Sequence, residues 1–289
     1  MNLAEEFQRD GVCVVRNLLD SHEVTAMRTA IDFVMATPSW RSVASAADEP
    51  GLFFEDFCRW PDVPAIAAVA RSKQIATVAA SLMGSQSVRL HHDHVLIKEP
   101  GTTMRTPWHQ DQPYYNIDGA QTVSFWIPVD PVPAAASLEV VARSHRGPWL
   151  MPRTFIDRES KWFADGTLAD VPDIEAARGE FDIRSFDMQP GDAVAFNMLS
   201  LHGAAGFIGP GRRRVLSLRY IGDDVLHAPR PWATSPEFPG LINEIPAGAP
   251  FDHPLFPVVW PHWTVRPVSS HKESPVPPMR GGPSRSLDS

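Results

Sequence analysis

Apolar side chains recur at helical spacing in the N-terminal third of the chain. Residues 17–36 carry apolar positions three and four residues apart, which predicts an amphipathic helix. Asp20 or Ser21 can cap its first turn, and Glu23 supports that turn. A second helix is expected over residues 63–83, ended by Gly84. These stretches predict a helical layer over about residues 17–85.

The pattern then changes to short runs of β-branched and aromatic residues. A first run, VCVV, already occurs at residues 12–15. Further strands are expected at 87–100, 121–132, 138–145 and 213–224, with two or three more in 181–206. Turn signals such as Pro190-Gly191 separate them, which favours a sandwich or barrel over a doubly wound parallel sheet. Residues 148–180 show no clear period and are interpreted as an insertion between strands.

The predicted fold class is mostly β with flanking helices. The helical layer would pack on an antiparallel jelly-roll core of about residues 87–224, within a single domain of residues 1–260. The chain has 289 residues, enough to bury a sizeable core. Residues 261–289 are rich in proline and small polar residues, and we expect a flexible tail there.

Charge and cysteine content exclude several classes of protein. The formal net charge is −8, so neither nucleic acid nor an anionic membrane is an expected partner. Only Cys13 and Cys58 are present, too few for a disulfide framework, and a reducing compartment is expected. The N-terminus lacks a secretory apolar segment, and no apolar run approaches the ~18 residues of a spanning helix. These features predict a cytoplasmic protein that acts on a small molecule.

One histidine and one aspartate lie two residues apart in the stretch TPWHQDQPYYN, residues 106–116. In an extended strand His109 and Asp111 point to the same face, where both reach one ion. His202, after the expected strand at 193–196, is the candidate third ligand. Two imidazoles and one carboxylate are typical of non-haem Fe(II) oxygenases. The pair alone is a weak signal, because His91 and Asp93 have the same spacing and such a histidine is more often a hydrogen-bonded strand residue.

Five spaced motifs make the comparison more specific. TPWHQDQPYYN, FWIPVD, LEVVARSHRG, MQPGDAVAFNMLSLHGAAG and RRRVLSLRY occur in an order that resembles the phytanoyl-CoA dioxygenase family. The opening FQRDGVCVVRNLLDSHEV is similar to that family as well, so the resemblance covers about residues 5–225. The family consists of Fe(II)- and 2-oxoglutarate-dependent oxygenases on a double-stranded β-helix, a kind of jelly roll.

The resemblance implies roles for individual residues. His109, Asp111 and His202 would hold iron, and Arg213 would bind the distal carboxylate of 2-oxoglutarate. A planar guanidinium suits that task, and strand alternation lets Arg213 point inward while its neighbours point out. Arg219 is a less favoured substitute. Trp126 and Thr106 would lie beside the cosubstrate, although Trp126 could equally be a core aromatic.

The expected substrate contacts come from two further stretches. Asp93 and Val95 share a face with Ile97, and by analogy that face looks into the barrel. The alternative is a strand turned over, with His92 and His94 inward. Tyr114 and Tyr115 wall the substrate entrance or pack beneath the following loop.

The resemblance implies hydroxylation, or desaturation, of a C–H bond, with O2 consumed and succinate and CO2 released. Related halogenases lack the carboxylate that Asp111 supplies. The nine tryptophans suggest an apolar or ring-bearing small molecule. The alternatives are a cupin-type metal enzyme that does not use 2-oxoglutarate, for which His91, His92 and His94 offer further ligands, and a catalytically silent binding module.

Overall fold

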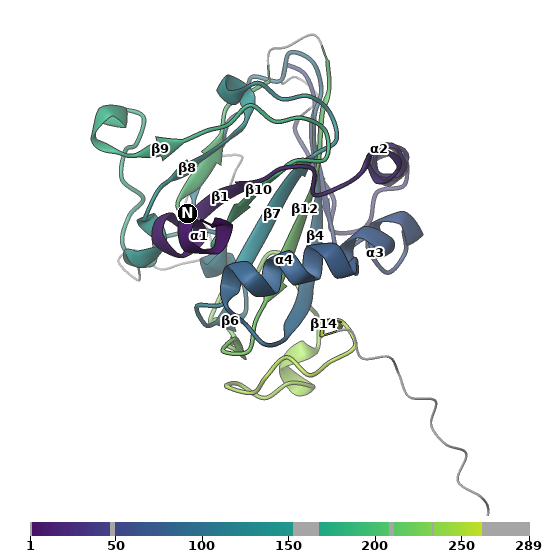
Figure 1. The fold of residues 1–289 in the computed structure, drawn as a ribbon, viewed down its shortest axis with the longest axis vertical. Coiled ribbons are helices and arrows are strands. Elements are labelled where there is room, and N and C mark those ends of the chain that lie inside the picture. The colour runs from purple at the N-terminus through teal and green to yellow at the C-terminus, as the bar shows by residue number, and fades with distance from the viewer. Residues whose placement is uncertain (1, 47–49, 153–167, 208–210, 233, 262–289) are drawn as a thin grey trace, which may run out of the picture.

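The computed structural model describes residues 2–46, 50–152, 168–207, 211–232 and 234–261. Its strands form two main antiparallel sheets, and helices cover one of them (Figure 1). The expected mostly β fold with an N-terminal helical layer is confirmed. No helix in the described part of the chain combines the length and apolar character needed to span a bilayer.

The larger sheet contains eight strands. Their order is β1 (Val12–Val15), β10 (Ala193–Phe196), β7 (Thr122–Pro128), β12 (Arg213–Ile221), β4 (Val88–Lys98), β3 (Phe53–Phe57) and β2 (Val43–Ala44), and β14 (Val258–Trp260) also pairs with β4. The smaller sheet has the order β5 (Thr106–His109), β11 (His202–Ala204), β8 (Leu138–Val141) and β9 (Ile183–Arg184). A separate pair joins β6 (Ile117–Asp118) to β13 (Leu226–His227).

Four α-helices precede most of the sheet in sequence. They are α1 (Leu3–Asp10), α2 (Ser21–Ala36), α3 (Pro64–Ala70) and α4 (Lys73–Met83). Asp20 caps α2 with its side chain and forms a reciprocal capping box with Glu23. Gly84 ends α4 in the left-handed conformation, as expected. Short 3-10 turns follow at Gln112–Tyr114 (η1), Ala134–Ala136 (η2), Ser144–Arg146 (η3), Arg178–Glu180 (η4) and Leu241–Asn243 (η5).

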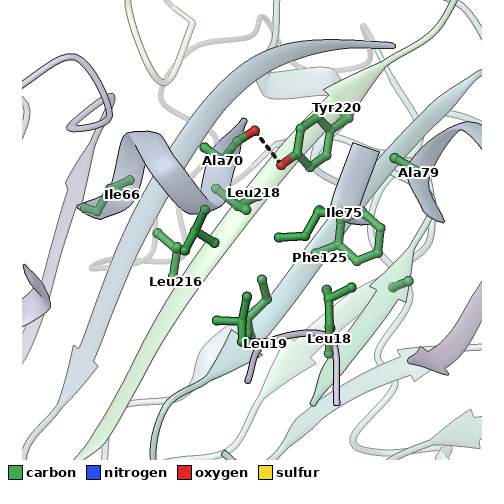
Figure 2. Close-up of a cluster of buried hydrophobic side chains, with 14 of the residues drawn as sticks. Leu18, Leu19, Ile66, Ala70, Ile75, Ala79, Phe125, Leu216, Leu218 and Tyr220 are labelled. Atoms are coloured by element: carbon green, nitrogen blue, oxygen red, sulfur yellow. Dashed lines mark hydrogen bonds between the residues drawn. The ribbon is translucent and has the colours of Figure 1, made fainter. Parts of the chain in front are cut away.

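The main core lies between the helices and the larger sheet. In Figure 1, α4 runs across the face that β7, β12 and β4 present to it. Figure 2 shows Ile66 and Ile75 of the helices among Leu216 and Leu218 of β12. Burying a side chain of this size contributes roughly 1.5–3 kcal/mol. The hydroxyl of Tyr220 donates a hydrogen bond to the carbonyl of Ala70 at 2.9 Å, which ties the end of α3 to β12 (Figure 2).

Several elements differ from the expectation. The single helix expected over 63–83 is two helices, because Arg71 and Ser72 leave helical geometry between them. Strand β3 falls inside the stretch expected to be helical; all of its residues are buried, so it has no alternation to reveal it. Beyond residue 224, β13, η5 and β14 add structure where no element was expected.

The space between the two sheets holds a second apolar cluster, to which both sheets contribute, including Trp126, Val140, Phe196 and Val215. The described ends of the 148–180 segment pack Leu150 and Ile174 against Trp108 on the opposite face of the smaller sheet. The expected tail beyond Pro261 lies outside the described residues.

Candidate metal centre

Pairing between β5 and β11 brings the two predicted histidines together. His109 ends β5 and lies directly opposite His202, the first residue of β11. Asp111 follows two residues later, but it is not in an extended strand: its backbone is αR at the start of η1, and its N–H donates to the carbonyl of Met198. The premise that strand alternation aligns His109 with Asp111 is therefore wrong. A turn brings the carboxylate back to the imidazoles instead.

The three side chains converge on one point. The Oδ1 atom of Asp111 is 3.6 Å from Nε2 of His109 and 3.6 Å from Nε2 of His202. One ligand atom from each residue lies within 4.8 Å of the others, and no further such group of three or more occurs in the described residues. All three side chains are buried. A single ion between them would meet two nitrogens and one oxygen.

Hydrogen bonds fix the orientation of both rings. Nδ1 of His109 lies 2.8 Å from the carbonyl oxygen of Pro107, and Nδ1 of His202 lies 2.9 Å from that of Ser200. A carbonyl only accepts, so Nδ1 donates in each ring and Nε2 is the nitrogen left to face Asp111. Burial, together with the neighbouring His109, lowers the pKa of His202 to about 3. Neutral imidazoles with free Nε2 atoms are the form that binds a metal.

Asp111 is oriented from the opposite side. Its Oδ2 atom accepts hydrogen bonds from Ser124 Oγ at 3.1 Å and from Arg219 Nη2 at 3.3 Å, which leaves Oδ1 toward the histidines. Burial alone would raise the pKa of Asp111, but the Arg219 guanidinium and the two imidazoles hold it well below its usual range. Arg219 also donates to the hydroxyl of Tyr115 at 2.9 Å.

The support from Ser124 and Arg219 was not predicted from the sequence. Arg219 was considered only as a substitute for Arg213. Strand alternation could have indicated the role of Arg219, because residues 213, 215, 217 and 219 of β12 face the same side. An arginine that points inward at that position needs a buried partner with which to pair.

A cavity lined by all three ligands opens beside them and is partly continuous with solvent. Its lining includes the predicted Thr106, Trp126, Tyr114, Tyr115 and Arg213. Tyr114 and Tyr115 are buried and contribute to the wall, while the C-terminal segment adds Ser235.

Arg213 is buried at one end of this cavity, 4% exposed. Within the described residues its hydrogen-bond partner is the carbonyl of Ala136, and it forms no ion pair there; its guanidinium carbon is 5.8 Å from the ring of Trp126. Burial lowers the pKa of Arg213 to about 10. The flanking Arg212 and Arg214 point away and pair with carboxylates, as alternation predicted.

The expected orientation of β4 is wrong. Val95 packs in the core beneath the helices, and Asp93 accepts hydrogen bonds there from the backbone N–H groups of Arg59 and Trp60. Burial raises the pKa of Asp93 to about 6, although these backbone hydrogen bonds act to lower it. The cavity instead receives Leu96 and His94; His92, which the alternative arrangement also placed inward, is not among its lining residues.

A shift in register lies just before this part of β4. Arg219 pairs with His92, whereas Tyr220 pairs with Leu90, so His91 is an extra residue in β4. Such a bulge inverts the alternation along a strand. His91 and His92 contact each other through Nδ1 at 2.9 Å, and neither they nor His94 join the metal-ligand group. The described residues therefore do not support a cupin-type metal site built from three or four histidines.

The comparisons with known proteins agree with this geometry. The profile of the phytanoyl-CoA dioxygenase (PhyH) family matches residues 7–215. A probable phytanoyl-CoA dioxygenase of Caenorhabditis elegans is 27% identical over 188 residues, which are 62% of this chain and only 53% of that protein. The ectoine dioxygenase of Stutzerimonas stutzeri (strain A1501) is 24% identical over 240 residues, 78% of each chain.

Two solved structures show the same fold. One is the epimerase SnoN in complex with Fe3+, alpha ketoglutarate and nogalamycin RO; its TM-score is 0.72 at 21% identity, over 89% of this chain and 97% of that one. The other is EctD from S. alaskensis with 2-oxoglutarate and 5-hydroxyectoine; its TM-score is 0.60 at 22% identity, over 86% and 83% of the two chains.

Proposed function

Because the chain belongs to the phytanoyl-CoA dioxygenase family, we propose that it is an Fe(II)- and 2-oxoglutarate-dependent dioxygenase. It hydroxylates, or desaturates, a C–H bond of a small apolar or ring-bearing molecule and releases succinate and CO2. The observation that carries the proposal is the convergence of His109, Asp111 and His202 on a cavity that is also lined by Arg213, a buried arginine with no ion pair among the described residues.

The donor set fits Fe(II). Two neutral imidazole nitrogens and one carboxylate oxygen on one side of an ion are the facial arrangement of non-haem iron oxygenases, which leaves positions open for cosubstrate and O2. Both rings and the carboxylate are held by their other polar atoms, as ligands of a real site usually are. When bound, Fe(II) with 2-oxoglutarate and O2 supplies the oxidising power that the protein's own side chains lack.

Arg213 fits a dicarboxylate cosubstrate. Its guanidinium is buried without an ionic partner in the described residues, and a carboxylate can meet it with two parallel hydrogen bonds. Trp126 and Thr106 line the cavity with it and would flank the same molecule.

The remaining lining supports the choice of substrate. The walls contributed by Phe53, Phe57, Leu96, Tyr114 and Tyr115 are mostly apolar. Such walls favour a hydrocarbon or ring body over a highly charged molecule.

The direct test is an anaerobic titration of the purified protein with Fe(II) and 2-oxoglutarate. We expect a weak visible charge-transfer band in the wild type that is lost in His202→Ala. His22→Ala, which removes an exposed imidazole on α2, is the matched control and should keep the band. Absence of the band in the wild type, or its persistence in His202→Ala, would refute the proposal; succinate release then distinguishes turnover from silent binding.

A further inference from the structure

A second polar group faces the cavity, to one side of the metal ligands. Glu55 of β3 and His94 of β4 both line it. Asp111 is held through Ser124 of β7 and Arg219 of β12, whereas β3 lies three strands from β7 in the sheet order. At ~4.8 Å between strands, that places the β3 side of the cavity roughly 14 Å from β7. This side therefore lies apart from Ser124 on β7, and through β4 it adjoins β12, the strand that carries Arg213, Ser217 and Arg219.

Glu55 and His94 form a buried pair. His94 Nε2 lies 3.1 Å from Glu55 Oε2, and each side chain is only 7% exposed. The ring of His94 stacks on Phe57 with centroids 3.9 Å apart. Burial lowers the pKa of His94 by more than the neighbouring Glu55 raises it, so the ring is neutral near pH 7. A neutral ring that donates from Nε2 to a carboxylate presents Nδ1 as an acceptor.

Two polar atoms beside this pair lack partners. Neither Nδ1 of His94 nor Oγ of Ser217 has a hydrogen-bond partner among the described residues. Register places Ser217 directly opposite His94 on the neighbouring strand, and it also lines the cavity. Buried polar groups are almost always satisfied in native proteins, so two unsatisfied atoms on residues that line a ligand cavity call for a ligand group.

We infer that Glu55, His94 and Ser217 form a polar subsite that receives a hydrogen-bond-donating group of the substrate, a hydroxyl or an amine. The inference rests on the proposed function and narrows its substrate class. Glu55 and His94 Nδ1 accept hydrogen bonds, so the matching group must donate. A carboxylate at this position would be repelled by Glu55. The substrate is an apolar or ring-bearing body with one such donor, which the subsite orients relative to the metal.

Small probes can test the subsite without knowledge of the natural substrate. Benzyl alcohol and benzylamine carry the donor, and ethylbenzene matches them in shape without it. Dissociation constants are measured by ligand-observed NMR on protein loaded with Zn(II) and 2-oxoglutarate. We expect at least one donor probe to bind ~5- to 100-fold more tightly than ethylbenzene, the range expected for neutral to charge-assisted hydrogen bonds.

Two variants localise the effect. His94→Phe keeps a ring against Phe57 and should abolish the preference for the donor probes. Glu55→Gln removes the charge and keeps an acceptor, so it should weaken the binding of benzylamine and leave that of benzyl alcohol. The donor probe that the wild type binds more tightly identifies the substrate group as an amine or a hydroxyl. Glu139→Gln is the matched control, because Glu139 pairs with Arg105 and Arg178 and does not line the cavity. Thermal melting verifies that each variant is folded.

Equal binding of all three probes to the wild type, which requires no variant to fold, would overturn the inference, as would a donor preference that survives in folded His94→Phe. The charge-transfer band is recorded on the same preparation with Fe(II) in place of Zn(II). A charge-transfer band without discrimination between the probes would refute the polar subsite and leave the proposed oxygenase function standing. Discrimination between the probes without a band would refute the oxygenase function and leave the subsite standing.

Discussion

Arg213→Met should separate cosubstrate binding from folding, because the two respond in opposite directions. The wild-type guanidinium is buried, with the Ala136 carbonyl as its hydrogen-bond partner among the described residues. Methionine has a similar length, fills the same space and carries no charge. The substitution therefore removes an anion-binding group and, at the same time, an unpaired buried charge.

The magnitudes follow from the surroundings of Arg213. Burial lowers its pKa from 12.5 to about 10, and at ~1.4 kcal/mol per pKa unit the buried charge costs about 3 kcal/mol. The hydrogen bond to Ala136 offsets about 1 kcal/mol of that cost. Arg213→Met should then raise the free energy of unfolding of the metal-free protein by about 1–2 kcal/mol. Loss of charge-assisted hydrogen bonds of ~1.5–3 kcal/mol each should weaken 2-oxoglutarate binding by roughly 100-fold or more.

Both quantities are measurable on one preparation. Urea denaturation gives the free energy of unfolding, and anaerobic titration of the Fe(II) protein gives the dissociation constant of 2-oxoglutarate. Arg212→Met is the matched control, since Arg212 points outward to Asp32 and Glu99; its cosubstrate affinity should be unchanged. Unaltered 2-oxoglutarate affinity in Arg213→Met, or a loss of affinity that merely follows a loss of stability, would refute the role assigned to Arg213.

Three further substitutions probe other parts of the account. Ser124→Ala removes one hydrogen bond to Asp111 and should weaken Mn(II) binding ~2- to 10-fold by calorimetry without unfolding the protein, whereas an unchanged affinity would show that Ser124 does not position the carboxylate. Burial lowers the pKa of Lys98 from 10.5 to about 6, so between about pH 6 and 10 the folded state binds fewer protons than the unfolded chain and stability rises with pH. Lys98→Met should reduce the slope of unfolding free energy against pH by up to ~1.4 kcal/mol per unit, whereas Lys73→Met on the exposed face of α4 should keep it. Tyr220→Phe should cost about 1–2 kcal/mol in urea denaturation, because it leaves the Ala70 carbonyl without its 2.9 Å partner; no loss would show that this contact does not stabilise α3.

The sequence predicted those elements that are specified by residues close together in the chain. The capping pair Asp20 and Glu23, the terminal Gly84 and the buried run Val12–Val15 each specify their structure within a few residues. The motifs around His109 and His202 likewise predicted a metal centre, and the structure places the three candidate ligands together.

Features that depend on pairing between distant segments were not predictable in the same way. The inward face of β4 is set by a bulge at His91, which only the register with Tyr220 reveals. Strand β3 is buried on both faces, so FFEDF carries no alternation, yet it supplies Glu55 to the cavity. Asp111 reaches the histidines through the turn at η1 rather than along a strand, so the correct residue was chosen with the wrong backbone geometry.

His109, Asp111 and His202 should together hold one divalent ion within reach of a dicarboxylate bound to Arg213. Anomalous diffraction from crystals grown anaerobically with Mn(II) and 2-oxoglutarate locates both groups in one experiment. We predict a single strong anomalous peak for Mn(II) within bonding distance of the two Nε2 atoms and of Asp111 Oδ1. The distal carboxylate of 2-oxoglutarate should lie against the Arg213 guanidinium. A peak bound elsewhere, or a cosubstrate that does not reach Arg213, would contradict it.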